Sequence, residues 1–512
     1  MTCAATDFKI TLASAPGKVL VVGGYLVLDR NYTGLVVGTN ACLYSTVQTT
    51  ALDLSNSDYA FGAADVPITV ISPQFESAWW KYAFDTKANT LTQYDSADQG
   101  SNGFVQIVLQ TTLALVNTRS PDALCTLLAN PVPAQHRVGL KILLTADNDF
   151  YSQREALAKV GATLTSQSLE QLPAMAKTGK TLGNVHKTGL GSSAAMVTSL
   201  VASILVHFGV LSKHDLCENN KQSCTATKGM QLVHNIAQYA HCLAQGKVGS
   251  GFDVSAAVYG SHVYRRFSPT VLEAAMSENS SIAELVQATS PENIGWNSEV
   301  APVVIPPRLT LRLADVDTGS NTPSMVKKVL LWQKSNPEQA ALLWASLDAA
   351  NDYIGQVWSS LVEASCSNST EYNSAIDWCS VRPSSEWKSD MGAVGNPTRA
   401  LLVNLVDGIL RVRQLQRELG ENAGVPIEPP KQTRLLDACM TVPGVCMAAV
   451  PGAGGYDAIF CIVLSQESGN AVEHVWSEWT EMSVGPLLAK QASSGVSVLD
   501  SKLYPSLTAM LE

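Results

Sequence analysis

The sequence lacks the patterns that mark secreted, zinc-binding and nucleic-acid-binding proteins. Its 11 cysteines include no CxxC pair, and 34 lysines and arginines are outnumbered by 44 aspartates and glutamates, which gives a net charge of -10. An odd number of cysteines without paired spacing fits neither a disulfide framework nor a zinc site, so we expect a reducing compartment. The negative charge argues against a general nucleic-acid binder, and any affinity for phosphate must come from local features.

Targeting segments and a clear membrane span are also missing. The first ten residues, MTCAATDFKI, contain neither a basic region nor an apolar run, and the last residues carry no recognisable address. Residues 194–211 approach the length of a membrane span, but Ser199, Ser203 and His207 recur every four residues and favour a core helix. We therefore expect a cytoplasmic protein whose partners include neither membrane nor nucleic acid.

What the sequence does contain is a large globular core and a glycine-serine loop that leads into an apolar helix. The 512 residues are 46% hydrophobic, enough for two or three domains. In KTGLGSSAAMVTSLVASIL, residues 187–205, Gly189 and Gly191 let backbone N–H groups approach an anion. Ser192 and Ser193 add hydroxyls and a possible helix cap. This pattern indicates a cradle for nucleotide phosphates.

Other interpretations of the loop are weaker or remain open. A Walker A loop ends in Gly-Lys-Ser/Thr, and this loop has no such lysine. A dinucleotide fingerprint follows an apolar strand, whereas residues 182–188 are polar. A plain loop that starts a buried helix stays open on these residues alone.

Two further glycine-rich stretches and a lysine turn could belong to the same site. Residues 8–29 predict two strands around a turn at residues 15–18, where Lys18 could meet a phosphate or simply be solvated. In residues 246–260, Asp253 follows two glycines and is either a catalytic carboxylate or a helix N-cap. Residues 445–464 place three glycines and Asp457 between apolar strands, which suggests backbone packed against a ligand or another loop.

The remaining pattern alternates strands and helices. We predict strands over residues 35–47, 138–145 and 309–316, and helices over residues 104–117 and 228–244. The last of these strands leads into a hydroxyl-rich helix start, GSNTPS, residues 319–324. Residues 52–103 give no clear pattern.

The three glycine loops together resemble the GHMP small-molecule kinase superfamily over essentially the whole chain. SAPGKVLVVGGYLVLD resembles the first superfamily motif, KTGLGSSAA the ATP-binding motif, GSGFDVSAAVYG the segment of the catalytic aspartate and PGAGGYDA the third motif. The resemblance implies a two-domain α+β fold. Residues 1–268 would be similar to domain 2 of ribosomal protein S5, and residues 269–512 would be ferredoxin-like, with the site between them.

Two segments, AQGKVGSGFDV and DTGSNTPSMVKKV, look like the eukaryotic members of the superfamily that act on mevalonate 5-phosphate. The resemblance therefore implies transfer of the ATP γ-phosphoryl group to mevalonate 5-phosphate, with ATP and Mg²⁺ as cofactors. A sibling enzyme that acts on mevalonate or its diphosphate, and a non-catalytic nucleotide or metabolite sensor, remain alternatives. The oligomeric state is left open.

The resemblance also assigns roles to residues. Lys18 and Asp253 would be catalytic, with Asp253 orienting Lys18 or the metal shell, because a phosphate acceptor with a second pKa of about 6 needs no base. Mg²⁺ would be held by Ser193 or Ser192, although residues 239–247 lack the glutamate that several relatives place there. The residues expected to bind ATP are Lys187, Gly189, Leu190, Gly191, Ser192, Ser193 and Ala194. The residues expected to bind the acceptor are Lys18, Tyr25, Lys247, Ser250, Gly251, Ser320, Thr322, Ser324, Gly454 and Gly455.

Overall fold

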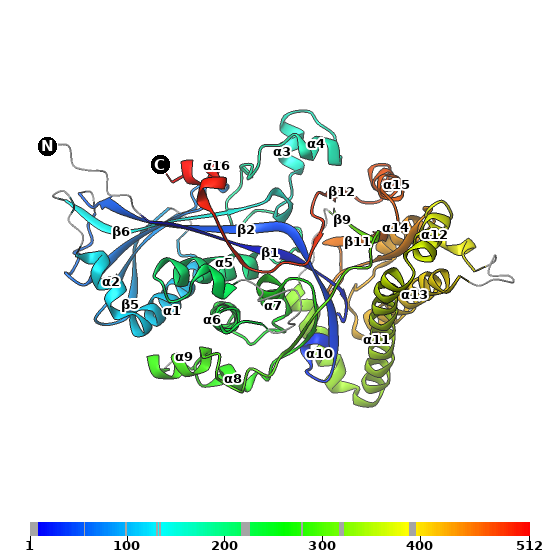
Figure 1. Ribbon diagram of the computed structural model, residues 1–512, viewed down its shortest axis with the longest axis horizontal. Coiled ribbons are helices and arrows are strands. Elements are labelled where there is room, and N and C mark those ends of the chain that lie inside the picture. Colours follow the sequence, from blue (N-terminus) through cyan, green and yellow to red (C-terminus); the bar gives the residue numbers. More distant parts are fainter. Residues whose placement is uncertain are drawn as a thin grey trace.

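Two β-sheets of different size lie next to each other along the long axis of the molecule (Figure 1). The computed structural model describes residues 9–55, 57–97, 100–129, 132, 135–216, 226–277, 280–316, 322–388 and 396–511. The large sheet has the order β14-β1-β2-β6-β3-β4-β5; β7 and β13 also pair with β2, and β8 pairs with β7. Its strands are β1 (Ile10–Val22), β2 (Thr33–Asp53), β3 (Asp65–Ile71), β4 (Trp79–Asp85), β5 (Thr90–Ser96), β6 (His136–Ala146), β7 (His262–Arg265), β8 (Glu299–Pro302), β13 (Gln491–Ala492) and β14 (Ser497–Leu499).

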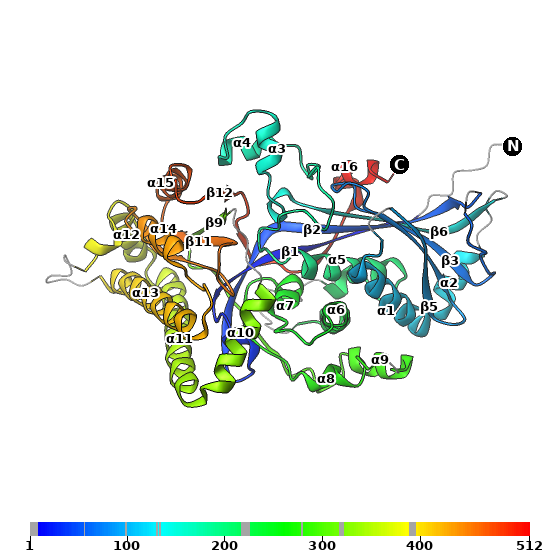
Figure 2. The ribbon, with the colours of Figure 1, turned by 180° about the vertical axis from the view of Figure 1, so that it is seen from behind.

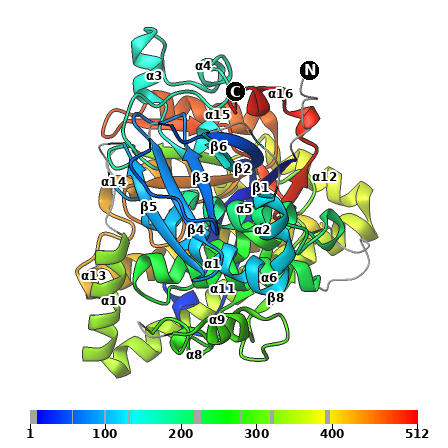
Figure 3. The same ribbon diagram turned by 90° about the vertical axis from the view of Figure 1, so that its left-hand side faces the viewer.

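Helices cover one face of the large sheet. They are α1 (Gly103–Arg119), α5 (Ser192–His207), α6 (Lys228–Gln245) and α7 (Phe252–Tyr259), and the view from behind shows them on the same side (Figure 2). Viewed from its end, the sheet shows β3, β4 and β5 in front of these helices (Figure 3). Helix α5 is apolar almost all round because it packs on β1, β2, α1 and α6.

The small sheet, in the order β10-β11-β9-β12, is antiparallel and buried on both faces. Its strands are β9 (Thr310–Val316), β10 (Val445–Ala449), β11 (Ala458–Val463) and β12 (Val484–Leu487). Alternate residues separate the two faces: Ile459 and Cys461 pack with α14 and α15, while Phe460 and Ile462 belong to the main core. The helices of this half are α10 (Thr322–Ser335), α11 (Pro337–Ser367), α12 (Ser369–Ser380), α13 (Pro397–Ala423), α14 (Pro430–Met440) and α15 (Gln466–Ser477).

Shorter elements join and extend these layers. They are η1 (Leu26–Leu28), α2 (Pro121–Leu128), η2 (Asn148–Phe150), α3 (Arg154–Lys159), α4 (Ser166–Glu170), η3 (Lys213–Leu216), α8 (Thr270–Glu273), α9 (Ile282–Thr289), η4 (Ser384–Glu386), η5 (Ser501–Leu503) and α16 (Pro505–Ala509). Among the helices of the described ranges, none combines the length and the apolar character that crossing a bilayer requires.

The predicted strands at residues 35–47, 138–145 and 309–316 and the helices at 104–117, 194–211 and 228–244 are confirmed. The prediction of two strands around a turn near residue 16 is wrong, because β1 runs on from Ile10 to Val22. The register against β2 shifts between Pro16 and Lys18. The pattern that suggested a turn is therefore a bulge inside one long strand.

The division at residues 268 and 269 stays a prediction. Three strands that follow residue 268, namely β8, β13 and β14, pair within the large sheet. The chain thus returns to the N-terminal sheet after it has built the small one.

Three buried histidines predict that the protein loses stability in mild acid. Burial lowers the pKa of His207 to about 3 and the pKa values of His234 and His262 to about 4. At a pH between its pKa in the folded protein and its ordinary pKa of about 6.5, each histidine takes up a proton on unfolding. The folding stability is therefore unaffected by these histidines above about pH 6.5 and decreases as the pH falls below that value. Asp147 acts in the opposite sense, because burial raises its pKa to about 6.

Burial also raises the pKa of Asp149, so it acts in the same sense as Asp147. The three histidines outweigh these two carboxyls, so unfolding near pH 5 should take up a net of about one to two protons, and the free energy of unfolding should fall by about 1–3 kcal/mol per pH unit there. Urea unfolding at pH 7, 6 and 5 measures this slope. In His207→Gln, which keeps a polar side chain toward Thr11 and Thr49, the slope should decrease by about one proton. A stability that does not change from pH 7 to 5 would contradict the prediction.

Candidate active site

The first two glycine motifs pack together as one unit. The backbone N–H of Lys18 donates to the carbonyl of Leu190 at 3.0 Å, and its ammonium donates to the carbonyl of Gly189 at 2.8 Å. Gly191 has a φ of +82°, and a Cβ there would lie 3.2 Å from Cε of Lys18. The bulge in β1 thus places Lys18 against the loop, and Gly191 leaves room for its side chain.

Helix α5 begins directly after this loop. Gly191, in the left-handed region, is the N-cap, and no side chain caps the helix. The expectation that one serine caps it is wrong, because Ser192 and Ser193 are already the first two helical residues. The Ser193 hydroxyl instead lies 3.1 Å from Nε2 of His241, and Ser192 hydrogen-bonds the hydroxyl of Tyr151. The first N–H groups of the helix remain suited to an anion.

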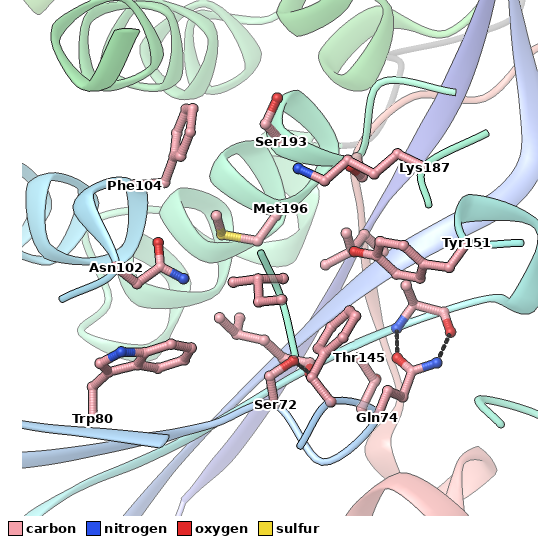
Figure 4. Close-up of a pocket in the computed structure, with 16 residues that line it drawn as sticks. Ser72, Gln74, Trp80, Asn102, Phe104, Thr145, Tyr151, Lys187, Ser193 and Met196 are labelled. Atoms are coloured by element: carbon pink, nitrogen blue, oxygen red, sulfur yellow. Dashed lines mark hydrogen bonds between the residues drawn. The ribbon is translucent and has the colours of Figure 1, made fainter. Parts of the chain in front are cut away.

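A cavity of about 90 Å³ opens on one side of the loop (Figure 4). Its wall combines aromatic rings, among them Trp80 and Phe104, with a few polar groups. The Asn102 oxygen accepts the Val105 N–H at 3.3 Å, which turns its amide nitrogen toward the cavity. The Lys187 ammonium points inward from the opposite side, and desolvation lowers its pKa. The full lining is Leu43, Ser72, Gln74, Phe75, Trp80, Asn102, Phe104, Leu144, Thr145, Ala146, Tyr151, Leu182, Lys187, Ser192, Ser193 and Met196.

A second cavity, of about 210 Å³, opens on the other side of the same loop. Thr188, Gly189 and Leu190 line it, whereas Ser192 and Ser193 line the first cavity. It is bounded by both halves of the chain; its other polar or glycine residues are Lys18, Tyr25, Ser250, Thr322, Gly452, Gly454 and Asp457. The glycine-serine loop therefore lies between two cavities of different character.

The charges of the second cavity centre on Lys18. Burial lowers the pKa of Lys18, while the carboxylates of Asp253 and Asp457 act to raise it. Its ammonium also lies 5.5 Å from the ring centroid of Phe252. Lys18 thus combines a partly desolvated cation with two acidic neighbours, an arrangement suited to meeting an incoming anion.

Asp253 does not cap helix α7, because the N-cap is Gly251. One Asp253 oxygen accepts the N–H of Val254 at 2.9 Å, and the other lies 3.9 Å from Nε2 of His241. Of the two readings of Asp253 that the sequence allowed, the structural cap is therefore wrong. The Asp253 side chain is one-quarter exposed, and its carboxylate does not cap a helix.

The third glycine loop, between β10 and β11, packs against backbone from both halves. A Cβ on Gly454 would lie 2.2 Å from the carbonyl of Ile427, which also accepts the N–H of Gly455 at 2.8 Å. The Tyr25 hydroxyl donates to the carbonyl of Ala453 at 2.8 Å, and burial raises the Tyr25 pKa. The contact with Ile427 thus explains why residue 454 is glycine, and of the two glycines predicted as ligands only Gly454 lines the cavity.

Only some of the other predicted site residues line a cavity. Thr322 and Ser250 line the second cavity, whereas Lys247 and Ser324 are exposed and line neither cavity. Ala194 is buried, and Gly251 packs against Gln238 and Tyr264. Ser320 lies outside the described residues. The binding roles given to all of these residues stay predictions.

Several cavity residues were not predicted. Trp80 and Asn102 come from a region in which the sequence showed no clear pattern apart from the pair Trp79-Trp80, and Phe104 begins a predicted helix to which no site was assigned. His241 lies in residues 239–247, which the sequence analysis noted only for the lack of a glutamate. Asp457 was noticed beside the glycines but was given no role.

Comparison with known proteins gives the family. The model "GHMP kinases C terminal" matches residues 405–481. A peroxisomal phosphomevalonate kinase of Arabidopsis thaliana is 38% identical over 510 residues, which cover 95% of each chain. A phosphomevalonate kinase of Gibberella zeae is 36% identical and covers 91% of this chain and 90% of its own. The chain belongs to the phosphomevalonate kinase family.

Solved structures agree with phosphomevalonate kinase membership at the level of the fold. A Lin0012 protein from Listeria innocua has a TM-score of 0.60 at 14% identity and covers 96% of this chain and 100% of its own. The phosphomevalonate kinase of Streptococcus pneumoniae, in complex with phosphomevalonate and AMPPNP, has a TM-score of 0.51 at 14% identity, and the match covers 94% of this chain and 99% of that chain. The predicted α+β GHMP kinase fold is confirmed. The name of the Arabidopsis phosphomevalonate kinase includes the peroxisome, and a cytoplasmic location for this chain stays a prediction.

Proposed function

We propose that this chain is an ATP-dependent kinase that transfers the γ-phosphoryl group of ATP to mevalonate 5-phosphate, giving mevalonate 5-diphosphate and ADP. The observation that carries the proposal is the pair of cavities on opposite sides of the glycine-serine loop, with Lys18 in contact with that loop. A nucleoside on one side and an acceptor on the other would meet at the loop. The names of the relatives support this choice of acceptor.

The first cavity suits the nucleoside of ATP. Its rings can stack on or enclose a base, and Asn102 can donate to one. From there the phosphates would pass Lys187 and reach the loop, where glycine backbone and the start of α5 offer N–H donors. Lys187, Gly189, Leu190, Gly191, Ser192, Ser193 and Ala194 would be the nucleotide-binding segment.

The residues also fit a magnesium ion that takes most of its ligands from the nucleotide and water. Within the described part of the chain no group of three His, Cys, Asp or Glu residues could hold a metal by itself. Mg²⁺ in kinases is commonly bound through one or two protein ligands plus substrate phosphates, and here these would be the Ser193 hydroxyl and the Asp253 carboxylate. When bound, the ion would neutralise phosphate charge during transfer.

Transfer would occur in the second cavity. An oxygen of the acceptor phosphate attacks the γ-phosphorus, and the bond from that phosphorus to the β–γ bridging oxygen breaks to release ADP. Lys18 stabilises the charge on the transferred group, and Asp253 orients Lys18. The acceptor phosphate is already ionised near neutral pH, so no residue needs to remove a proton.

Residues from both halves would bind the acceptor. Tyr25, Ser250, Thr322 and Gly454 line the cavity. Lys247, Gly251, Ser324 and Gly455, which do not line the cavity, remain candidates, as does Ser320, which lies outside the described residues. A site formed in this way by residues 1–268 and 269–512 agrees with the proposed two-domain division.

Phosphorus NMR of the purified protein with ATP, Mg²⁺ and mevalonate 5-phosphate tests the function. The expected result is the loss of the acceptor monophosphate signal together with the appearance of a diphosphate and ADP. Binding of ATP without turnover of any acceptor from the same pathway would favour a sensor and would remove the proposal.

We predict that the two loop serines have unequal effects. Ser193→Ala should raise the Mg²⁺ concentration for half-maximal rate by about 10-fold or more, because a ligand of the ion is lost. Ser192→Ala should leave the magnesium requirement unchanged and alter only the KM for ATP, because its hydroxyl is engaged with Tyr151. Rates measured at a series of Mg²⁺ concentrations check this, and equal shifts in both variants would contradict it.

A further inference from the structure

A buried histidine lies between the loop serine and the proposed catalytic aspartate. His241 is in the last turns of α6, and 3% of its side chain is exposed. Its Nε2 atom is 3.1 Å from Oγ of Ser193 and 3.9 Å from an oxygen of Asp253. One ring nitrogen thus lies within 4 Å of two residues that are sixty positions apart in the sequence, and it hydrogen-bonds one of them, Ser193.

The other contacts of the ring hold it in place. Its ring centroid lies 5.5 Å from that of Phe104, which lines the first cavity. The Gln245 amide nitrogen is 3.3 Å from Nε2. Phe104 and Gln245 therefore hold the ring on two sides.

We propose that His241 is a positioning residue for phosphoryl transfer, and this inference rests on the proposed kinase function. The hydrogen bond between the Ser193 hydroxyl and Nε2 fixes the rotamer of Ser193, and so it sets where the hydroxyl oxygen lies at the edge of the first cavity. The ring also fills the space beside Asp253, so it sets the spacing between the hydroxyl and the carboxylate. His241 itself touches neither nucleotide nor acceptor.

A ring that only fills the core would act differently on substitution. Phenylalanine has nearly the shape of histidine and suits the apolar contact with Phe104, whereas glutamine is a poorer filler that keeps a polar atom near the position of Nε2. A filling role predicts that His241→Phe is the milder change. A positioning role predicts that His241→Gln is the milder change.

Steady-state kinetics of the two variants decide between these roles. We expect His241→Phe to lower kcat by roughly 10–100-fold with little change in the KM for the acceptor, and His241→Gln to stay within a few-fold of the wild type. Thermal unfolding is measured in parallel. The opposite ranking, or a His241→Phe variant as fast as the wild type, would overturn the proposal.

A second measurement does not depend on turnover. In ¹⁵N NMR of histidine-labelled protein, the His241 signal is assigned from its loss in His241→Gln. Ser193→Ala should shift the Nε2 resonance of His241, and the matched variant Ser192→Ala should not. An unshifted resonance in Ser193→Ala would overturn the proposal even if His241→Phe fails to fold. A wild type without acceptor-dependent ADP release would instead remove the proposed function, and the resonance would still report on the contact.

Discussion

Lys18→Met and Asp253→Asn should each reduce kcat by about 100-fold or more while the protein still folds. The Lys18 ammonium lies against the glycine-serine loop and faces two carboxylates, so its loss removes a preorganised positive charge where the transferred phosphoryl group would pass. Asp253→Asn keeps the shape of the side chain and removes the charge that orients Lys18. Steady-state ADP release with both substrates saturating measures the effect.

Matched controls come from surface ion pairs far from both cavities. Lys228 pairs with Glu292, and Asp407 pairs with Lys388. Lys228→Met and Asp407→Asn make the same chemical changes and should stay close to the wild-type rate, because exposed pairs contribute little.

The pH profile of Asp253→Asn tests its role further. If Asp253 positions Lys18, the residual rate should level off above the titration of the acceptor phosphate. A rate that continues to rise log-linearly to about pH 9 would instead show that the wild-type carboxylate removes a proton.

The second large effect should be discrimination between acceptors. We expect kcat/KM for mevalonate 5-phosphate to exceed that for mevalonate by several orders of magnitude. A pocket that binds a dianion leaves the cationic and hydroxyl groups that line it, among them Lys18 and Thr322, without the phosphate when the smaller alcohol enters, and buried polar groups that lose a partner are costly. Mevalonate also presents a neutral hydroxyl, and its reaction would require a base.

ADP release with the two acceptors at equal concentrations, measured side by side, checks this selectivity. The KM for ATP should be similar wherever turnover is detectable, because the nucleotide would occupy the separate first cavity. Comparable rates with both acceptors would remove the acceptor assignment, although the kinase fold would stand.

Parts of the site could be predicted because local sequence determines them. Gly189 and Gly191 both have positive φ, which glycine tolerates best, so the loop was visible in the sequence. Lys18 and Asp253 were found because each belongs to a compact motif. By contrast, Trp80 lies on a strand that the sequence did not predict, and Asn102 and Phe104 lie at a helix start that carries no ligand-binding motif.

Other local predictions failed where distant segments decide the conformation. The Pro16-Gly17 pair reads as a turn, but pairing with β2 on one side and contact with Leu190 on the other keep it within a bulged strand. The glycines near residue 454 allowed either a ligand or another loop as the neighbour, and at Gly454 the neighbour that excludes a side chain is the carbonyl of Ile427. In both cases the conformation depends on a backbone group that is distant in the sequence, so a short stretch of sequence could not have predicted it.

The sequence by itself determined several strands and helices and the glycine-serine loop before α5, because hydrophobic periodicity and glycine content act over a few neighbouring residues. The tertiary structure alone decided how these pieces meet. It placed Lys18 on the loop, cavities on both sides of it, and His241 between Ser193 and Asp253. These contacts join residues tens to hundreds of positions apart, and their distances follow from how β1, α5, α6 and α7 pack rather than from any local preference.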